Sequence, residues 1–231
     1  MQSIRAVPPT IFETFPRAIS VAKTAQATGT QSQSLRQFRS SPAQQYTGTA
    51  VMSTSLGFSQ YKIQTTTFPT APGVSLNDPQ KVITGSILDL FAGRPSLRKL
   101  SLWKDDAVFA DPITIAEGRK QYAPQWYGLE KAFSNIERLG GQVTSSGNPI
   151  EMDLKTRYTV KGLGSQQTID SKIKIWTEGE GDAMRIKRVE DRWDDNLPDS
   201  TFKNAMRNLN SVVVPTLVSV PKSIEEEEKG S

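Results

Sequence analysis

The sequence contains no cysteine and no histidine among its 231 residues. These absences exclude disulfide bonds, thiol nucleophiles, Cys/His zinc sites and every catalytic triad that uses a histidine base. Magnesium or calcium can bind carboxylates alone, but the sequence has no loop with such ligand spacing. We therefore expect no metal site and no cofactor.

The sequence also lacks a long apolar run, and its excess of basic charge is confined to one end. No run is long enough to span a bilayer, so we expect no membrane-spanning segment. Residues 1–45 hold five basic residues and one acidic residue, and this difference equals the net charge of +4 of the whole chain. The basic balance is therefore no sign of nucleic-acid binding, and we expect no nucleic-acid partner.

Residues 1–45 are typical of a targeting leader, because they are rich in Arg, Ser and Thr and almost free of acidic residues. The stretch from Arg36 to Gln45 resembles the two-step mitochondrial cleavage pattern. In that pattern an octapeptide beginning at Phe38 would be removed, and the mature chain would begin at Tyr46. We predict a location in the mitochondrial matrix. A chloroplast leader is the less favoured alternative, and an ordinary N-terminal tail is the other.

The rest of the chain divides into three parts by composition. Residues 46–77 carry a single charge among many Thr, Ser, Gly and Pro, and this composition predicts a linker. A β-branched stretch at 61–67 could instead pair as an edge strand. The folded domain is predicted over 78–214, and residues 215–231 are predicted to be a disordered acidic tail.

The predicted domain begins with three helices and one strand. Asp78 followed by Pro79 is a typical helix start, and Ser96 is placed to cap a short second helix. A strand is predicted at 107–110, and a third helix covers about 118–133. The aromatic-rich face of that third helix, with members four, three and four residues apart, consists of Tyr122, Trp126, Leu129 and Phe133.

After the helices the apolar period changes to two, which predicts strands. One long strand covers Ile150–Val160, a second contains 169–175, and a third covers about 183–193. Short connections between them predict an antiparallel meander. The phase of the third strand slips between Ile186 and Val189, which predicts a bulge.

Helices followed by a long antiparallel sheet define an α+β fold. The order of elements, the stretch Leu102–Pro112 and the pair Gly118-Arg119 resemble the nuclear transport factor 2-like superfamily, specifically its SnoaL-like (polyketide-cyclase-like) branch. Members commonly show Tyr or Trp, two polar residues, Ala-x-Phe-x-Asp-Pro and then Gly-Arg or Gly-Lys. The closing strand, Val189–Asp194, is similar to organellar members that have no assigned reaction. The resemblance implies a cone-shaped fold, with N-terminal helices packed on a strongly curved antiparallel sheet.

The resemblance leaves the function open, because this superfamily holds isomerases, cyclases, dehydratases and non-catalytic binding or scaffold domains. A bent sheet that does not close leaves a space beside the third helix, lined by apolar side chains with a few polar ones at its mouth. The candidate ligand-binding residues are Phe109, Tyr122, Trp126, Tyr158 and Trp193. For each of them, ordinary core packing is the alternative.

Asp111 and Asp191 are the candidate catalytic residues. Asp111 follows a buried strand, and a carboxyl group held among aromatic rings has a raised pKa and can transfer a proton. The alternative for Asp111 is the Asx turn that Asp-Pro favours. Asp191 is in phase with Trp193 if the bulge is present, and a cross-strand ion pair is its alternative. Tyr122 or Tyr158 could then donate a hydrogen bond to a developing oxyanion.

Three functions follow from this sequence. The first is binding of a small apolar molecule in the cavity. The second is a cofactor-independent acid/base enzyme of isomerase, cyclase or dehydratase type. The absence of histidine counts against it, because some cyclase-like members use a His–Asp pair. The third is a dimeric protein-interaction module, since the sheet face in this superfamily often pairs two subunits. Trp176, predicted on that face with Lys172 and Lys174, would suit a homodimer contact.

Overall fold

The computed structural model describes residues 49–194, 200–210 and 218–230, and the predicted leader at 1–45 lies outside these residues. The helices are α1 (Thr49–Gln60), α2 (Asp78–Phe91), α3 (Leu97–Leu100), α4 (Arg119–Ala132), α5 (Ser200–Asn210) and α7 (Ile224–Lys229). The strands are β1 (Trp103–Asp111), β2 (Thr114–Glu117), β3 (Phe133–Ser145), β4 (Ile150–Val160), β5 (Gln166–Glu178) and β6 (Arg185–Trp193). No helix among the described residues is long and apolar enough to cross a membrane.

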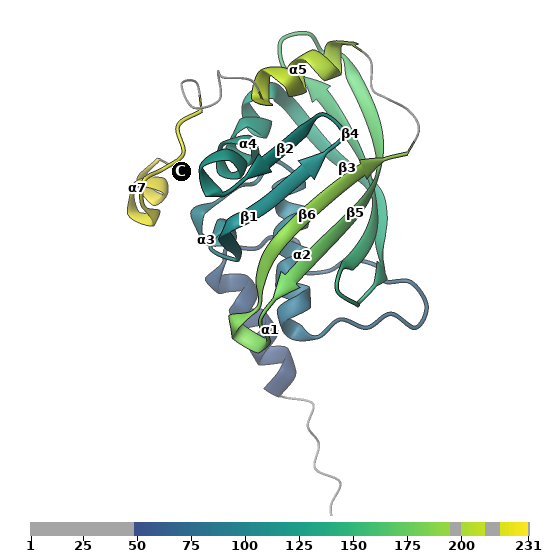
Figure 1. Cartoon of the computed structure of the whole chain (residues 1–231), viewed down its shortest axis with the longest axis vertical. Coiled ribbons are helices and arrows are strands. Elements are labelled where there is room, and N and C mark those ends of the chain that lie inside the picture. The colour runs from purple at the N-terminus through teal and green to yellow at the C-terminus, as the bar shows by residue number, and fades with distance from the viewer. Residues whose placement is uncertain (1–48, 195–199, 211–217, 231) are drawn as a thin grey trace, which may run out of the picture. The chain divides into compact units, whose positions relative to one another are not determined.

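The six strands form one sheet in the order β2-β1-β6-β5-β4-β3. All neighbours are antiparallel except β1 and β6, which run parallel. The sheet curls without closing (Figure 1). The predicted α+β fold with a curved sheet is therefore confirmed. The pairing of β5 with β6 shifts between Trp176 and Thr177, opposite the stretch of β6 where the sequence predicts a bulge.

Helix α2 begins with a capping box one residue earlier than predicted. The side chain of Asn77 accepts the backbone N–H of Gln80 at 2.9 Å, and the Gln80 side chain accepts the backbone N–H of Asn77 at 3.0 Å. The N-cap is therefore Asn77, because it has Gln80 three residues on, whereas the sequence analysis assigned this role to Asp78. Ser96 caps α3 as predicted, with its hydroxyl 3.2 Å from the backbone nitrogen of Lys99.

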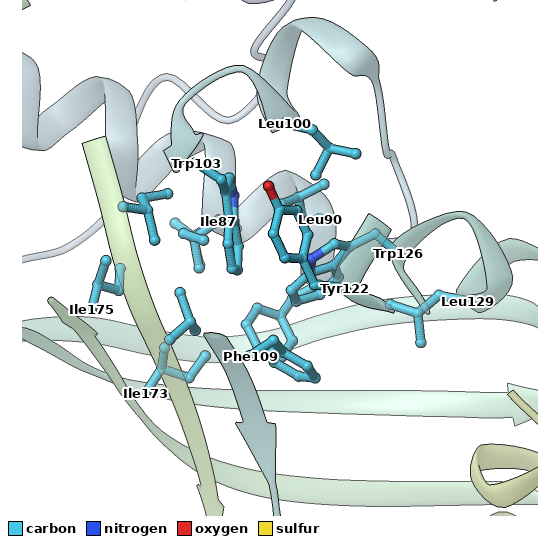
Figure 2. Packing of buried hydrophobic residues seen from close by; sticks show 14 of the residues in the cluster. Ile87, Leu90, Leu100, Trp103, Phe109, Tyr122, Trp126, Leu129, Ile173 and Ile175 are labelled. Atoms are coloured by element: carbon cyan, nitrogen blue, oxygen red, sulfur yellow. The ribbon is translucent and has the colours of Figure 1, made fainter. Parts of the chain in front are cut away.

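The core lies between the inner face of the sheet and helices α2 and α4. The predicted apolar face of the third helix is buried there, although the helix ends one residue before Phe133, which begins β3 instead. Figure 2 shows this packing, with side chains from α2, α3, α4 and the sheet: Ile87, Leu90, Leu100, Trp103, Phe109, Tyr122, Trp126, Leu129, Ile173 and Ile175.

The described part of the predicted linker (46–77) is folded instead. It begins with α1, which packs on α2, and the side chains of Phe58 and Ile63 are buried in the core. The backbone passes so close to α2 that a Cβ atom at Gly85 would lie 2.5 Å from the carbonyl oxygen of Thr65. The sequence pattern marked only 61–67, as a possible edge strand, but the structure has no strand there. The pattern therefore did not reveal which of these side chains are buried.

A buried ion cluster that sequence analysis did not identify attaches this segment to the end of α2. The carboxylate of Asp89 is fully buried and accepts hydrogen bonds from the backbone N–H groups of Gln64 at 2.7 Å and Thr65 at 3.1 Å. Arg94 donates to it at 2.6 Å, and the ammonium group of Lys99 lies 3.2 Å away. Burial raises the pKa of Asp89, but these hydrogen bonds and charges outweigh it and lower the pKa below its ordinary value.

The described part of the predicted acidic tail is folded as well, because helix α7 contacts α3. Both carboxylate oxygens of Glu227 accept the backbone N–H of Leu97, each at 3.1 Å, and the hydroxyl group of Tyr127 also donates to Glu227. Glu228 forms ion pairs with two basic side chains, at 2.8 and 3.1 Å. This run of acidic residues resembles a solvated tail in the sequence because these partners lie 100 or more residues earlier in the chain.

The outer face of the sheet carries paired charges. Lys174 and Glu151 lie 2.7 Å apart, and so do Arg188 and Glu190. Trp176 is half-buried on this face, opposite Arg188 in the strand register. Surface ion pairs of this kind contribute less than about 1 kcal/mol each to stability. A homodimer through this face stays a prediction.

Candidate functional site

A cavity lies between the inner face of the sheet, helix α4 and helix α5. It is lined by Phe91, Phe109, Asp111, Gln125, Trp126, Leu129, Tyr158, Ile169, Asp191, Trp193, Phe202 and Met206. Its empty volume is about 480 Å³ when the open mouth is included, but a water molecule can be centred in only about 30 Å³ of it. The second volume decides what fits, so the cavity in this form admits only a few water molecules.

The open end of the cavity is its more polar end. Four lining residues are half-buried and the others are buried, so these four mark the side that solvent reaches. They are Asp111, Gln125, Trp193 and Met206. An apolar interior with a few polar groups at the mouth is the usual construction of a small-molecule site.

The parallel pairing of β1 with β6 brings the two candidate catalytic residues together. Phe109 pairs with Val189 and Ala110 with Glu190, so the same register continued by one residue places Asp111 beside Asp191. Neighbouring strands lie about 4.8 Å apart, and side chains two residues apart share a face. Both carboxyl groups therefore point to the inner face, where both line the cavity.

Asp111 makes an Asx turn and lines the cavity at the same time. Its Oδ1 accepts the backbone N–H of Ile113 at 2.8 Å, so the turn proposed as the alternative for this residue is present. Burial raises the pKa of Asp111 to about 6, although hydrogen bonds from Ile113 and Thr114 oppose the shift. The turn therefore orients the carboxyl group, and the cavity makes its ionised form costly.

Asp191 lies deeper, with 6% of its surface exposed. Its Oδ2 accepts the indole N–H of Trp193 at 2.9 Å, whereas its Oδ1 is buried and has no hydrogen-bond partner among the described residues. Burial raises the pKa of Asp191 to about 7, and the charge of Asp111 adds to the shift, while Trp193 and Ser171 oppose it. The cross-strand ion pair proposed as the alternative is not formed, because the residue opposite on β5 is Ile173.

Tyr158 completes the polar part of the cavity. Burial, followed by the negative charges of Asp191 and Asp111, raises the pKa of its hydroxyl group, and a hydrogen bond with Thr156 opposes this shift. The phenol therefore remains protonated at neutral pH and can act as a hydrogen-bond donor. Three ionisable groups from β1, β4 and β6 thus face one aromatic-lined space.

Comparisons with known proteins concern the fold. No family model matches the chain, and no curated protein matches it. The hexachlorocyclohexane dehydrochlorinase LinA-type3 from Novosphingobium barchaimii LL02 matches 51% of this chain and 86% of its own, with 12% identity and a TM-score of 0.41. An NTF2-like protein of unknown function from Exiguobacterium sp. 255-15 matches 49% of this chain and 99% of its own, with 18% identity and a TM-score of 0.40. A SnoaL-like family protein from Agrobacterium tumefaciens str. C58 matches 50% of this chain and 97% of its own, with 17% identity and a TM-score of 0.38.

The described chain has helices followed by one curled, mostly antiparallel sheet, which is the order of elements that the resemblance to the nuclear transport factor 2-like superfamily implies. Membership of that superfamily, and the similarity to its organellar members, stay predictions from the order of elements and from Leu102–Pro112. The matches cover about half of the chain and are distant in sequence, so no residue of the cavity takes a role from them.

Four of the five predicted ligand-binding residues line the cavity. They are Phe109, Trp126, Tyr158 and Trp193. The Phe109 and Trp126 rings lie 4.8 Å apart between centroids, and Phe91 lies 5.2 Å from Trp126. Their place on the wall is observed, and their binding of a ligand stays a prediction.

Tyr122 does not line the cavity, which corrects its assignment as a ligand-binding residue. Its ring stacks on Trp103 with centroids 4.9 Å apart, and its hydroxyl group donates to the backbone carbonyl of Lys104 at 3.0 Å. This hydroxyl is already engaged with the backbone, so it is not the donor proposed for an oxyanion. Tyr122 lies one turn before Trp126 on α4, and Figure 2 shows it within the packed core.

Helix α5 supplies a wall of the cavity that sequence analysis did not identify. The Phe202 ring lies 5.5 Å from both Phe133 and Tyr158 and 6.0 Å from Trp193, measured between centroids. Met206 lies one turn later on the same helix and also lines the cavity. The spacing of these apolar residues indicates a helix face but not the surface that it covers. Among the described residues, no group of three or more acidic side chains could hold a metal ion.

Proposed function

We propose that this chain binds a small, largely apolar molecule in the cavity and holds its polar group against the carboxyl pair. The observation that supports this most directly is the placement of Asp111 and Asp191 side by side in an otherwise aromatic and aliphatic space. Burying two acids without a basic partner costs stability, and groups that are kept at such a cost are commonly functional.

The small volume limits how the molecule is bound. A ligand larger than a few water molecules must extend through the open end or displace side chains of α5. Phe202 and Met206 belong to this helix, and the Phe202 ring packs on the rings of Phe133, Tyr158 and Trp193. The ligand that fits best therefore has an apolar or aromatic body that can replace these contacts.

Native mass spectrometry of the full chain, purified gently from its own source, tests this proposal. We expect a bound mass that is released on denaturation. The substitution Ile169→Phe fills the cavity and should abolish the bound mass, whereas Ile115→Phe, at a site that is 68% exposed, should retain it. An empty wild-type protein, or a mass that Ile169→Phe retains while folded, would overturn the proposal.

Acid/base catalysis is a second candidate function, and a specific observation favours it. The pKa values of about 6 for Asp111 and about 7 for Asp191 lie near neutrality, where a carboxyl group can both accept and donate a proton. Tyr158 is a protonated donor in the same space and could stabilise a developing oxyanion. An isomerase, cyclase or dehydratase working without cofactor needs only these groups.

The test of catalysis uses the molecule that mass spectrometry identifies. Asp111→Asn preserves the Asx turn and should lower turnover by about 100-fold or more if the carboxyl group transfers a proton. Asp106→Asn, at a site that is 77% exposed on the same strand, is the matched control. Full activity in Asp111→Asn would remove this residue from the mechanism and leave binding as the function.

We also propose the mitochondrial matrix as the location and a homodimer through the outer sheet face. If the leader is cleaved as predicted, the protein isolated from its source begins at Tyr46, and an N-terminus intact at Met1 would contradict this. Sedimentation should give a dimer that Trp176→Glu converts to a monomer, with Leu163→Glu, at a separate exposed site, as the control. A monomeric wild-type protein would exclude the interaction module built on this face.

A further inference from the structure

The cavity contains acidic groups without a basic counterpart. Asp111 and Asp191 are both on its wall, and none of the described residues that line it is Lys or Arg. Buried charges in proteins are normally paired with an opposite charge or bind an ion. Elsewhere in this protein that rule is followed, since the buried carboxylate of Asp89 has Arg94 at 2.6 Å and Lys99 at 3.2 Å.

One oxygen of Asp191 is available to a ligand. Asp191 is 6% exposed, and its Oδ1 is a buried acceptor without a hydrogen-bond partner among the described residues. The other oxygen accepts the indole N–H of Trp193 at 2.9 Å, which holds the carboxyl group in place. A ligand that donates a hydrogen bond to Oδ1 would satisfy the unpaired acceptor.

The remaining wall is built largely from aromatic rings. Phe109, Trp126, Tyr158 and Trp193 line the same cavity as the two acids. The face of an aromatic ring carries negative potential and attracts cations, most strongly for Trp and where water is excluded. Acids and ring faces therefore favour the same sign of charge in a bound molecule.

We infer that the polar group of the ligand is a protonated amine, and that the cavity selects organic ammonium ions over neutral molecules of the same shape. This inference rests on the proposed binding function and specifies its ligand class. An ammonium group would donate to Oδ1 of Asp191, neutralise one of the two adjacent carboxylates and lie against the ring faces. An anionic ligand would meet two acids and no basic side chain, so it is excluded by the same charges.

Two pairs of probes test this selection on the full chain: ethylammonium with ethanol, and benzylammonium with benzyl alcohol. The members of each pair have the same number of heavy atoms and differ in charge. At pH 8 both carboxyl groups are ionised, and we expect calorimetry to show each ammonium ion binding at least tenfold tighter than its alcohol. Asp191→Asn should weaken this preference severalfold, and the double variant Asp111→Asn/Asp191→Asn should lose most of it, while the exposed control Asp106→Asn should retain it.

Proton release gives a second readout that a purely structural role would not change. A cation beside Asp191 stabilises the ionised carboxylates, so ammonium binding at pH 7 should release protons into the buffer. The titratable groups that face Asp191 and take part in this linkage are Asp111 and Tyr158, and the side chains of Trp193 and Ser171 act to lower the pKa of Asp191. Calorimetry in two buffers of different ionisation enthalpy measures this release, and its absence would overturn the inference.

The remaining outcomes separate this inference from the proposed function. Equal or tighter binding of the alcohols would overturn the cation preference and leave small-molecule binding intact. A neutral or anionic bound mass in the native protein would do the same. If none of the four probes binds and the native protein carries no bound mass, both the inference and the proposed function are wrong.

Discussion

Asp89 and Asp191 are both buried carboxyl groups, but their surroundings differ in almost every respect. Asp89, at the end of α2, receives hydrogen bonds from two backbone N–H groups and the guanidinium group of Arg94, and Lys99 lies beside it. Asp191, on β6, receives one hydrogen bond from Trp193 and has an unpaired oxygen. The first site lowers the pKa of its acid and the second raises it.

The two buried carboxyl groups affect the folded state in opposite ways. At Asp89, the charge is fully paired, and the cluster connects the segment after α1 to α2 and α3. At Asp191, the missing partner is a cost to the folded state that only a proton or a ligand can relieve. The two buried acids are therefore distinguished by their partners rather than by their burial.

The largest change in stability is expected from a substitution that breaks the ion cluster at Asp89. Asp89→Asn leaves the ammonium group of Lys99 buried without its carboxylate and should lower the free energy of unfolding by about 3–5 kcal/mol at pH 7. Because the pKa of Asp89 is lowered on folding, this contribution is present above about pH 4 and is lost as the pH falls further. Urea denaturation at pH 7 measures the change.

The control for this prediction is Asp106→Asn, which removes an exposed carboxylate and should change stability by less than about 0.5 kcal/mol. If the loss at Asp89 is no larger than at Asp106, the ion cluster does not hold the segment after α1 in place.

The next effect concerns the apolar cover of the cavity. Phe202→Ala removes a ring that contacts three other aromatic residues and should cost about 3 kcal/mol of stability. Because burial is the main cause of the raised pKa of Asp191, admitting water should also lower that pKa from about 7. Denaturation gives the first quantity, and a carbon-detected NMR titration of the Asp side chains gives the second. An unchanged pKa in a folded variant would show that α5 does not exclude water.

Asp191→Asn should raise the free energy of unfolding, whereas Asp89→Asn should lower it. The pKa of Asp191 is raised on folding, so its ionisation destabilises the native state progressively as the pH rises from about 4 to about 7. A shift of about three pKa units corresponds to about 4 kcal/mol, so the variant should be more stable than the wild type by about this amount at pH 8, with the difference vanishing near pH 4. Thermal denaturation at several pH values measures this, and a loss of stability at pH 8 would show that the carboxylate is paired after all.

The smallest effect is the coupling between the two cavity acids. The charge of Asp111 contributes to the raised pKa of Asp191, so Asp111→Asn should lower that pKa by a fraction of a unit. The stability changes of the two single variants should then add to more than that of the double variant, by about 0.5–1 kcal/mol. Strict additivity would mean that the two carboxyl groups titrate independently.

Local patterns predicted most of the helices and strands. The alternation from Ile150 to Val160 is strand β4 with the same bounds, and the aromatic spacing on α4 predicts its buried face. Hairpin β1–β2 was missed because β2 has only four residues, too few to show a period. Helix α1 was missed because its sequence has neither charge nor apolar periodicity to mark it.

The candidate site was predicted in its members but not in its arrangement. Asp111 and Asp191 were identified separately, each with a structural alternative. Their adjacency depends on the parallel pairing of β1 with β6, two strands about 80 residues apart whose side-chain alternation carries no information on which strand is the neighbour. For Asp111 both interpretations hold at once, because the Asx turn orients the carboxyl group that lines the cavity.

The sequence by itself determined the α+β class and the exclusion of cysteine and histidine chemistry, and it named Asp111 and Asp191 as the candidate catalytic acids. Tertiary structure alone decided that these acids share one cavity, that Tyr122 belongs to the core, and that Phe202 covers the space beside Tyr158. Periodicity records which face of an element is apolar, since that depends on neighbours three or four residues away. Which distant element covers that face, and whether a buried charge finds a partner there, depends on packing that no local pattern contains.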